Sequence, residues 1–416
     1  MTSTTSRPQR AARPWGAGAL VSRLDSPVTS YYVLVGATAV LVVIGLVMVL
    51  SASMVTSYQD DGSSFAVFIK QAQFAVIGLV ATVVAARLPV AWWKRLALPA
   101  LVGALLLQLL VFTPLGVTVN GNRNWLRFSS ALSFQPSELT KLGLVLVGAL
   151  VFANKGRRVR TLHQIVVPYL VPISLVTIGL VLLGHDLGTA LVLLGIVGAV
   201  LWAAGVPSRF FLATAAAAAL GAALLVVTSA TRMGRITNWL SGSCNDPDGA
   251  CGQSVHGLYA LADGGWWGVG LGASKEKWAW LAEAQNDFIF AIIGEELGLP
   301  GTLSLLILFA MIAAACYRIV YRARDPFVRI ATAGVMAWLM LQTIINVGGV
   351  IGLLPVVGVP LPLVSAGGSA LVTTMVAMGM LISFARSEPG ASEILSTRPS
   401  VVRRSLAVLP GRRRRR

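Results

Sequence analysis

Long runs of apolar residues constrain this chain more than any other feature of its sequence. Of its 416 residues, 56% are hydrophobic and only 12% are charged. In a typical soluble domain, roughly a quarter of all residues are charged. A membrane-spanning helix needs about 20 predominantly apolar residues. We therefore predict an all-α, polytopic integral membrane protein with about ten transmembrane helices. The predicted helices cover residues 32–52, 66–86, 96–113, 136–154, 166–184, 187–206, 210–230, 287–316, 328–350 and 368–386.

The basic residues predict the orientation of these helices, because cytoplasmic loops of membrane proteins are enriched in Lys and Arg. Arginines precede the first predicted helix, basic clusters follow the second and fourth, and others surround the end of the eighth. All of them lie on one side if both termini are cytoplasmic. Of the 16 acidic residues, twelve then lie in or beside outward-facing segments. This asymmetry indicates chemistry on the outer face.

The predicted organisation is one transmembrane domain, residues 31–386, between two tails. The tails, residues 1–30 and 387–416, are rich in Ser, Pro and Arg and are expected to be disordered. Attraction to anionic lipid explains the terminal arginines, and docking of a cytoplasmic partner is the alternative. The net charge of +17 does not indicate a nucleic-acid partner, because the basic residues lie in tails and short loops between apolar spans.

The largest segment outside the predicted spans is the outward loop at residues 231–286. Loops of this length are usually functional or disordered. Its tryptophans, between glycines in residues 264–272, are typical of a surface at the lipid headgroup level. Cys244 and Cys251 can form a disulfide if the loop faces an oxidising compartment. A metal site is less favoured there, because no further ligand has suitable spacing.

Asp287 ends that loop, immediately before the apolar run at residues 288–293. A carboxylate at such a boundary is partly desolvated, which should raise its pKa and suit it to act as a general base. The structural alternative is a helix N-cap, for which Asp is among the best residues. Glu283 precedes Asp287 by four residues, so a helical path would place both carboxylates on one face. Glu295 and Glu296 are candidate buried partners.

A second polar group surrounds the start of the fourth predicted helix. Pro136 opens this helix, and Ser137 and Glu138 follow in the first turn, where an acid complements the helix dipole. Lys141 lies three residues after Glu138, so the two side chains can pair. The pair is either structural or functional, because charges inside a membrane are costly enough to suggest function. Arg123 precedes the group in the chain.

Two further outward turns carry polar motifs. The first precedes the sixth predicted helix and contains Asp186 and Thr189. The second follows Asn346 and is a segment rich in Pro and Gly that we predict to be re-entrant. This segment leads into the tenth helix through Ser365, Gly367, Gly368 and Ser369.

One geometric argument joins these groups. If the N-terminus is cytoplasmic, every even-numbered helix begins at the outer face, and the fourth, sixth and tenth each carry one of the motifs. Helix N-termini bind phosphate groups, because unpaired N–H groups and the helix dipole favour negative charge. With Arg123 and Lys141, these helix ends predict one outward-facing, partly membrane-buried site for an anionic lipid headgroup.

Four motifs in this order resemble the SEDS family (shape, elongation, division and sporulation) of bacterial peptidoglycan polymerases. They comprise residues 120–125 with 135–141, 186–189, 287–290 with 294–298, and 360–369. The resemblance covers residues 30–386. The segment Gly45–Ser53 and the long basic tails are more similar to the division branch of the family than to the elongation branch.

The resemblance implies a reaction. The donor is the growing glycan linked through pyrophosphate to undecaprenyl, and the acceptor is the GlcNAc 4-hydroxyl of lipid II. Forming the β-1,4 bond inverts the anomeric centre, which requires a base for the acceptor and stabilisation of the departing pyrophosphate. The essential acid of the family corresponds to Asp287. By the same resemblance Glu138, Lys141 and Asp186 line a central cavity, and Arg123 and residues 365–369 are further candidates.

The resemblance also implies partners and a location. The expected partners are a class B penicillin-binding protein, which is a transpeptidase, and other membrane proteins of the divisome. The expected location is the bacterial cytoplasmic membrane at the division septum. The sequence requires no cofactor, although outward carboxylates near a pyrophosphate are compatible with a divalent cation, Mg²⁺ or Mn²⁺. A lipid flippase and a non-catalytic division scaffold are the alternative functions.

Three positions depart from the family pattern. His185 stands where the family usually has Pro, Ala282 replaces the Pro of a Leu-Pro-Glu motif, and Ala366 replaces a Tyr. None of these changes removes a charged group. We therefore expect altered loop geometry and retained activity.

Overall fold

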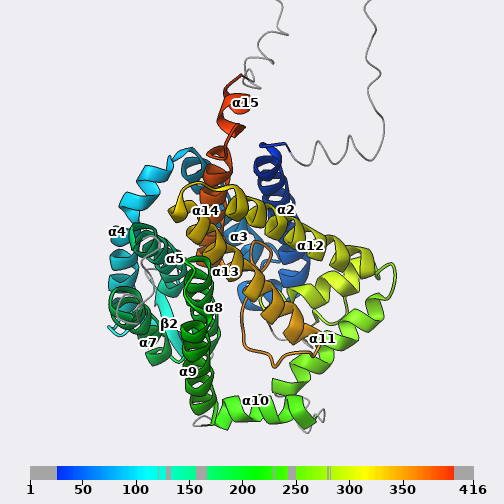
Figure 1. Cartoon of the computed structure of the whole chain (residues 1–416). Coiled ribbons are helices and arrows are strands. Elements are labelled where there is room, and N and C mark those ends of the chain that lie inside the picture. The colour runs from blue at the N-terminus through cyan, green and yellow to red at the C-terminus, as the bar shows by residue number, and fades with distance from the viewer. Residues whose placement is uncertain are drawn as a thin grey trace, which may run out of the picture.

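The computed structural model describes most of the chain between the two tails. The described residues are 26–119, 121–127, 133–155, 166–227, 230–241, 250–278, 281 and 283–397. Within them the molecule is predominantly helical (Figure 1).

In the part of the chain that the structure describes, seven helices are long and apolar enough to cross a membrane. They are α2 (Thr29–Asp61), α3 (Ala66–Arg87), α4 (Val90–Leu110), α5 (Pro136–Lys155), α12 (Ile289–Arg322), α13 (Pro326–Val350) and α14 (Gly368–Arg386). Each one overlaps a predicted span. Shorter apolar helices cover three more predicted spans: η2 (Val166–Leu175), a π-helix that continues into α7 (Val176–Leu183), then α8 (Leu187–Ala203) and α9 (Ser208–Val227).

Helices α5, α8 and α13 pack against one another and form the centre of the bundle (Figure 1). Small residues allow this close approach: a Cβ on Gly334 of α13 would meet the Val145 side chain of α5 at 3.0 Å. Around them, α4 covers α5, and α14 packs against α3. The outer faces of α2, α3, α4 and α12 expose Val, Leu and Ile side chains, as expected for surfaces that face lipid.

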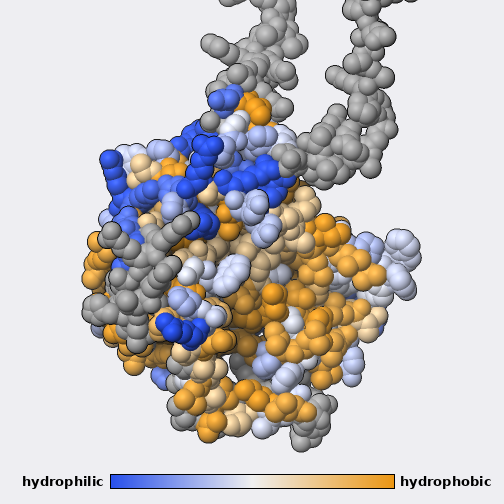
Figure 2. Space-filling model, viewed as in Figure 1, coloured by the Kyte–Doolittle hydropathy of each residue, from blue (hydrophilic) through white to orange (hydrophobic). Residues whose placement is uncertain are grey.

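One end of the molecule carries a polar surface. Figure 2 shows hydrophilic residues gathered at the end that carries α15 (Ala391–Thr397), above a side surface that is largely apolar. Helix α15 lies in the tail that we expected to be disordered, so that expectation is wrong for these seven residues. The remainder of that tail, from residue 398, and residues 1–25 of the other lie outside the described residues.

The all-α expectation needs one correction, because the structure contains a small antiparallel sheet. Strands β1 (Gly116–Val119), β2 (Asn122–Arg127) and β3 (Ser133–Phe134) pair in the order β1-β2-β3 between α4 and α5. The strands are too short to give a period-two pattern. The predicted outward loop at 231–286 also contains two helices, α10 (Ala230–Ser241) and α11 (Ala250–Gly264).

Glycine and proline disfavour a continuous helix, so the sequence Gly298-Leu299-Pro300-Gly301 predicts a break in this span, and α12 is interrupted there. Gly298 has φ 65° and ψ −159°, a conformation essentially restricted to glycine. Pro300 has no N–H to donate to the Glu296 carbonyl oxygen. The loop after α11 supplies the missing donor, because the Gly270 N–H donates to that oxygen at 3.0 Å. The kink and the loop are therefore one packing unit.

Candidate functional site

Three helix N-termini meet at Gln135, as the sequence predicts for the fourth, sixth and tenth helices. The Gln135 backbone N–H donates to the hydroxyl of Ser369, at the start of α14, at 3.2 Å. Its side-chain amide donates to the carboxylate of Asp186, at the start of α8, at 3.2 Å. Gln135 itself directly precedes α5. The convergence of three helix ends concentrates partial positive charge in one place.

Asp186 is the N-cap of α8. Its carboxylate accepts hydrogen bonds from the Thr189 backbone N–H at 2.8 Å and from the Thr189 hydroxyl at 2.7 Å. Both residues are buried. With the bond from Gln135, the contacts of this carboxylate fix the helix ends relative to one another. The preceding residue, His185, has φ 66°, which proline cannot adopt, so this turn differs from one that contains proline.

The predicted pair between Glu138 and Lys141 is confirmed. Their charged atoms lie 2.7 Å apart, with the side chains only 3% and 1% exposed. The Lys141 ammonium also lies 5.2 Å from the ring centroid of Trp338 on α13, a cation–π geometry. Within the described part of the chain, the second Glu138 carboxylate oxygen and the Ser137 hydroxyl are buried without a hydrogen-bond partner. The pair therefore keeps unused capacity to bind a polar group.

Arg123 lies on β2, and its guanidinium binds the end of α4 rather than the charged pair. It donates to the backbone carbonyls of Val111 at 3.1 Å and Thr113 at 3.1 Å. These carbonyls follow the last turn of α4, where helix carbonyls lack partners within the helix. The contacts give Arg123 a structural role, and its predicted role in anion binding stays a prediction.

Asp287 lies two residues before the first residue of α12 and is half-buried. The N-cap of α12 is Phe288, so the alternative N-cap interpretation of Asp287 is wrong. Its main-chain carbonyl accepts a hydrogen bond from the Asn346 amide at 2.8 Å, and the same amide binds the Val359 carbonyl at 2.9 Å. Asn346 thus fixes Asp287 against α13 and the 356–359 segment.

A shallow pocket lies beside the Asp287 carboxylate. It is lined by Asp287, Phe288, Asn346, the end of α13 and residues 356–359. A Cβ added to Gly358 would lie 3.4 Å from an Asp287 carboxylate oxygen, so the glycine backbone passes close to this oxygen. The far side of the same segment packs on the start of α8, where a Cβ on Gly188 would meet the Val359 side chain at 3.0 Å. Asp287 and the converging helix ends therefore border one region.

Glu283 does not share a helical face with Asp287, contrary to the prediction. Residues 283–288 form turns, and Glu283 itself has a left-handed φ of 58°. Its carboxylate accepts a hydrogen bond from the Asn286 side chain. A non-glycine residue in the left-handed region ends any helical path. The spacing of Glu283 and Asp287 in the sequence gives no sign of this conformation.

Ser365 connects the re-entrant segment to the Asp287 turn. Its hydroxyl donates to the Asn286 carbonyl at 2.6 Å. Gln71 of α3, which the sequence analysis missed, binds the Ser365 carbonyl at 3.2 Å and accepts from the Gly367 N–H at 3.1 Å. The signal available in the sequence was the polar side chain of Gln71 inside a predicted apolar span. Gly368 is a packing position, because a Cβ there would meet the Phe74 ring at 2.4 Å.

Neither a metal cluster nor the disulfide is established. Among the described residues, no group of three or more His, Cys, Asp or Glu side chains lies close enough to hold a metal ion. Cys244 falls outside the described residues, as does the side chain of Cys251, so their pairing stays a prediction. Cys316 is a free, buried cysteine of α12.

Comparisons with known proteins identify the family. The sequence profile of the FtsW/RodA/SpoVE family of cell cycle proteins matches residues 32–389. The chain is also 40% identical over 391 residues to a protein of Mycobacterium tuberculosis named "Probable peptidoglycan glycosyltransferase FtsW", covering 92% of this chain and 74% of that protein. The chain belongs to this family. A Geobacter metallireducens member with the same name is 36% identical, covering 82% of this chain and 90% of its own length.

Solved structures agree with this membership. A chain of a peptidoglycan synthase complex, described as coordinating polymerization and crosslinking, has a TM-score of 0.68 and 28% identity, with 85% of this chain and 96% of that chain covered. The rod shape determining protein RodA of Thermus thermophilus has a TM-score of 0.63 and 27% identity at the same coverage. The predicted resemblance to SEDS polymerases is confirmed.

Proposed function

We propose that this chain is a peptidoglycan glycosyltransferase that polymerises lipid II into β-1,4 glycan strands, with Asp287 as the general base. Relatives at 36–40% identity carry the name of this activity. The observation that carries the assignment of Asp287 is its position: half-buried, next to Gly358, and beside the region where the N-termini of α5, α8 and α14 meet.

The geometry supports the two requirements of inversion at an anomeric carbon. The Asp287 carboxylate removes the proton of the acceptor 4-hydroxyl as that oxygen attacks C1 of the donor sugar. The bond from C1 to the pyrophosphate breaks, and undecaprenyl pyrophosphate leaves with the bonding electrons. The converging helix N-termini and Lys141 favour the negative charge on that group. Thr189, Ser137 and the residues from Ser365 to Ser369 complete the proposed surroundings of the substrate.

The proposed arrangement in the membrane has ten spans with both termini cytoplasmic, so that Asp287 faces outward. The seven long helices and the three shorter apolar segments supply this number.

We place the protein at the division septum because its relatives carry the FtsW name. A class B penicillin-binding protein is the proposed partner, supported by the structural likeness to a complex that couples polymerization with crosslinking. A divalent cation, if the reaction uses one, would be held mainly by the pyrophosphate of the substrate.

The test is polymerisation of lipid II by the purified protein, alone and with the partner transpeptidase. We expect glycan strands from the wild type and none from Asp287→Asn, which keeps the side-chain size but removes the base. Asp263→Asn is the matched control, because Asp263 is an exposed carboxylate of the same loop region, paired with Lys275. Lipid II transport into vesicles without polymerisation would favour the flippase, and full growth of cells that carry Asp287→Asn would favour the scaffold.

A further inference from the structure

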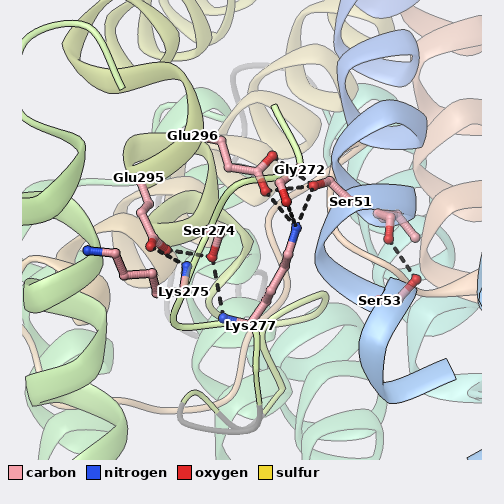
Figure 3. A network of polar contacts seen from close by, with 9 residues as sticks. Ser51, Ser53, Gly272, Ser274, Lys275, Lys277, Glu295 and Glu296 are labelled. Carbon is pink, nitrogen blue, oxygen red and sulfur yellow. Dashed lines mark hydrogen bonds and ion pairs between the residues drawn. The ribbon is translucent and has the colours of Figure 1, made fainter. Parts of the chain in front are cut away.

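Two adjacent glutamates of α12, Glu295 and Glu296, are fully buried and reach in different directions (Figure 3). Glu296 accepts hydrogen bonds from the Ser51 hydroxyl of α2 at 2.6 and 2.8 Å. It also pairs with the Lys277 ammonium at 3.2 Å, and the Lys277 side chain is only 3% exposed. The pair is therefore enclosed between the bundle and the outer loop.

The Lys277 ammonium uses all of its capacity in this enclosure. A lysine has three N–H donors, and here they meet the Gly272 carbonyl at 2.6 Å, Glu296 at 3.2 Å and Ser51 at 3.5 Å. These acceptors belong to the loop, to α12 and to α2 (Figure 3). Lys277 thereby connects three elements through one charged group and has no donor left for a substrate.

Glu295 holds the same loop through a second set of hydrogen bonds. Its carboxylate accepts from the Ser274 hydroxyl at 2.6 Å and from the Lys275 backbone N–H at 2.6 Å. The Ser274 hydroxyl in turn accepts from the Lys277 backbone N–H at 3.3 Å. Residues 272–277 are thus attached to the first turns of α12 by two carboxylates, a few residues after Asp287.

The segment from Lys277 to Asp287 is held at both of its ends. At its beginning, the segment is held by the ion pair of Lys277 with Glu296. At its end Ser365 binds the Asn286 carbonyl at 2.6 Å, and Asn346 binds the Asp287 carbonyl at 2.8 Å. Of the residues between, those that the structure describes (Trp278, Leu281 and residues 283–286) form turns and a bend rather than a helix. A chain of turns lacks its own repeating hydrogen bonds, so its geometry depends on these attachments.

A purely stabilising role explains the buried pair poorly. Replacing a buried ion pair by uncharged groups of similar size is often neutral or even stabilising, because burying two charges costs solvation free energy. What such a pair supplies is a fixed geometry between the elements it joins. Here those elements are the two helices α2 and α12 and the segment that carries Asp287.

We propose that Lys277 and Glu296 form a positioning clamp, which holds the Asp287 segment in place relative to α2 and α12. Both act on catalysis through Asp287 and touch no substrate. This inference rests on the proposed function, in which Asp287 is the base. Misplacing a reacting group by about 1 Å can cost roughly a hundredfold in rate.

The first test compares Lys277→Met with Lys275→Met in the purified protein. Lys275 is the matched control, because its side chain is 75% exposed and methionine keeps its backbone N–H. We expect Lys277→Met to lower kcat for lipid II polymerisation about a hundredfold and to leave KM nearly unchanged, since no substrate contact is lost. Lys275→Met should resemble the wild type. A wild-type kcat in Lys277→Met, or a loss confined to KM, overturns the proposal.

The second test is independent of activity and measures hydrogen exchange. In Lys277→Met the amides of residues 283–288, including the Asn286 N–H that binds the Glu283 carbonyl, should lose protection while α5, α8 and α13 keep theirs. Unchanged protection of 283–288, or a loss spread evenly over the molecule, contradicts the clamp. If Lys277→Met does not fold, Ser51→Ala replaces it and should show the same pattern at smaller amplitude, because it removes the hydroxyl contacts to Glu296 and Lys277 but no charge.

These measurements separate failure of the clamp from failure of the proposed function. Asp287→Asn should be inactive and keep wild-type exchange in residues 272–277. If the wild type itself makes no glycan, the proposed function fails, and the exchange comparison still decides whether Lys277 orders the Asp287 segment. If the wild type is active and Lys277→Met matches it in both kcat and exchange, the clamp alone fails.

Discussion

At the scale of single residues, the buried Glu138–Lys141 pair combines high cost with unused bonding capacity. Its charged atoms lie 2.7 Å apart, yet one Glu138 oxygen has no partner among the described residues. An ion pair that served stability alone would be expected to satisfy all of its hydrogen-bonding atoms. The free oxygen, next to the converging helix ends, fits a group that meets substrate.

This pair yields a prediction that separates stability from activity. Lys141→Met leaves the Glu138 charge buried and unpaired, which should destabilise the protein by about 3–5 kcal/mol. The double variant Glu138→Gln with Lys141→Met removes both charges and should recover most of that loss while remaining inactive. Thermal unfolding in detergent and lipid II polymerisation measure the two effects. A double variant that regains both stability and activity would show that the pair is structural only.

Glu388 gives a prediction for pH. It follows α14 and is only 3% exposed. Burial raises the pKa of its carboxyl above the ordinary value of 4.5, although the neighbouring Ser30, Arg318 and Arg322 lower it in part. The folded protein therefore binds this proton more tightly than the unfolded chain does. The resulting stabilisation is complete below pH 4.5 and is lost as the pH rises through the raised pKa.

Local opening around α15 should report this loss. We expect the amides of residues 391–397 to exchange faster as the pH rises above 4.5, after correction for intrinsic exchange. Glu388→Gln removes the titration and should flatten the profile. Glu393→Gln, a change in α15 itself, is the control and should keep the wild-type profile. An identical pH dependence in Glu388→Gln and the wild type would refute the assignment.

At the scale of elements, the kink of α12 organises the outer loop. Gly298 lies against the loop backbone: a Cβ there would come within 2.5 Å of the Gly268 nitrogen. Its φ of 65° and ψ of −159° add strain for any other residue. The side chain of a larger residue would push the loop from the carbonyls of Glu295 and Glu296, whose partners are the N–H groups of Val269 and Gly270.

We predict that Gly298→Ala destabilises the protein by at least about 1–3 kcal/mol, the cost of a strained backbone alone. Gly103→Ala in α4 is the matched control, because no atom lies within 4 Å of a Cβ at that helical position. It should be neutral or stabilising by about 0.5–1 kcal/mol, since alanine favours helix. Thermal unfolding of both variants measures the difference. Equal melting temperatures would contradict the packing described for the kink.

The elements also show what the sequence could and could not predict. Apolar length located the helices, and Gly298 with Pro300 predicted the break in α12, because these signals are local. The spacing of three residues predicted the Glu138–Lys141 pair for the same reason. The sheet and the binding of Arg123 to α4 depend on partners that local spacing does not show. The left-handed turn at Glu283 is set by its surroundings, so the predicted helical path there was wrong.

At the scale of the whole molecule, the polar contacts distinguish the two ends of the helix bundle. Lys94 pairs with Asp325 at 2.7 Å, which joins the N-terminal part of α4 to the N-cap of α13. The Ser383 hydroxyl donates to the Leu88 carbonyl near that end. The candidate site lies at the other end of the bundle, because Ser369 and Asn346 stand at the ends of α14 and α13 that are opposite to Ser383 and Asp325. The molecule therefore has a basic end and an end that carries the candidate site, and the positive-inside rule supports the proposed orientation with the basic end in the cytoplasm.

This orientation predicts which positions a membrane-impermeant thiol reagent can reach. With the three natural cysteines replaced, Ser63→Cys in the turn between α2 and α3 should be labelled in intact spheroplasts. Ser208→Cys at the start of α9 and Ser387→Cys after α14 should be labelled only after the membrane is permeabilised. All three residues are exposed, so burial does not explain a difference. Labelling of Ser387→Cys in intact spheroplasts would show that the C-terminal end faces outward. Labelling of Ser208→Cys without labelling of Ser387→Cys would show that the number of spans before residue 208 differs from the proposed number. Either result would remove Asp287 or the three helix ends from a common outer face, and the site could not then act on one lipid-linked substrate.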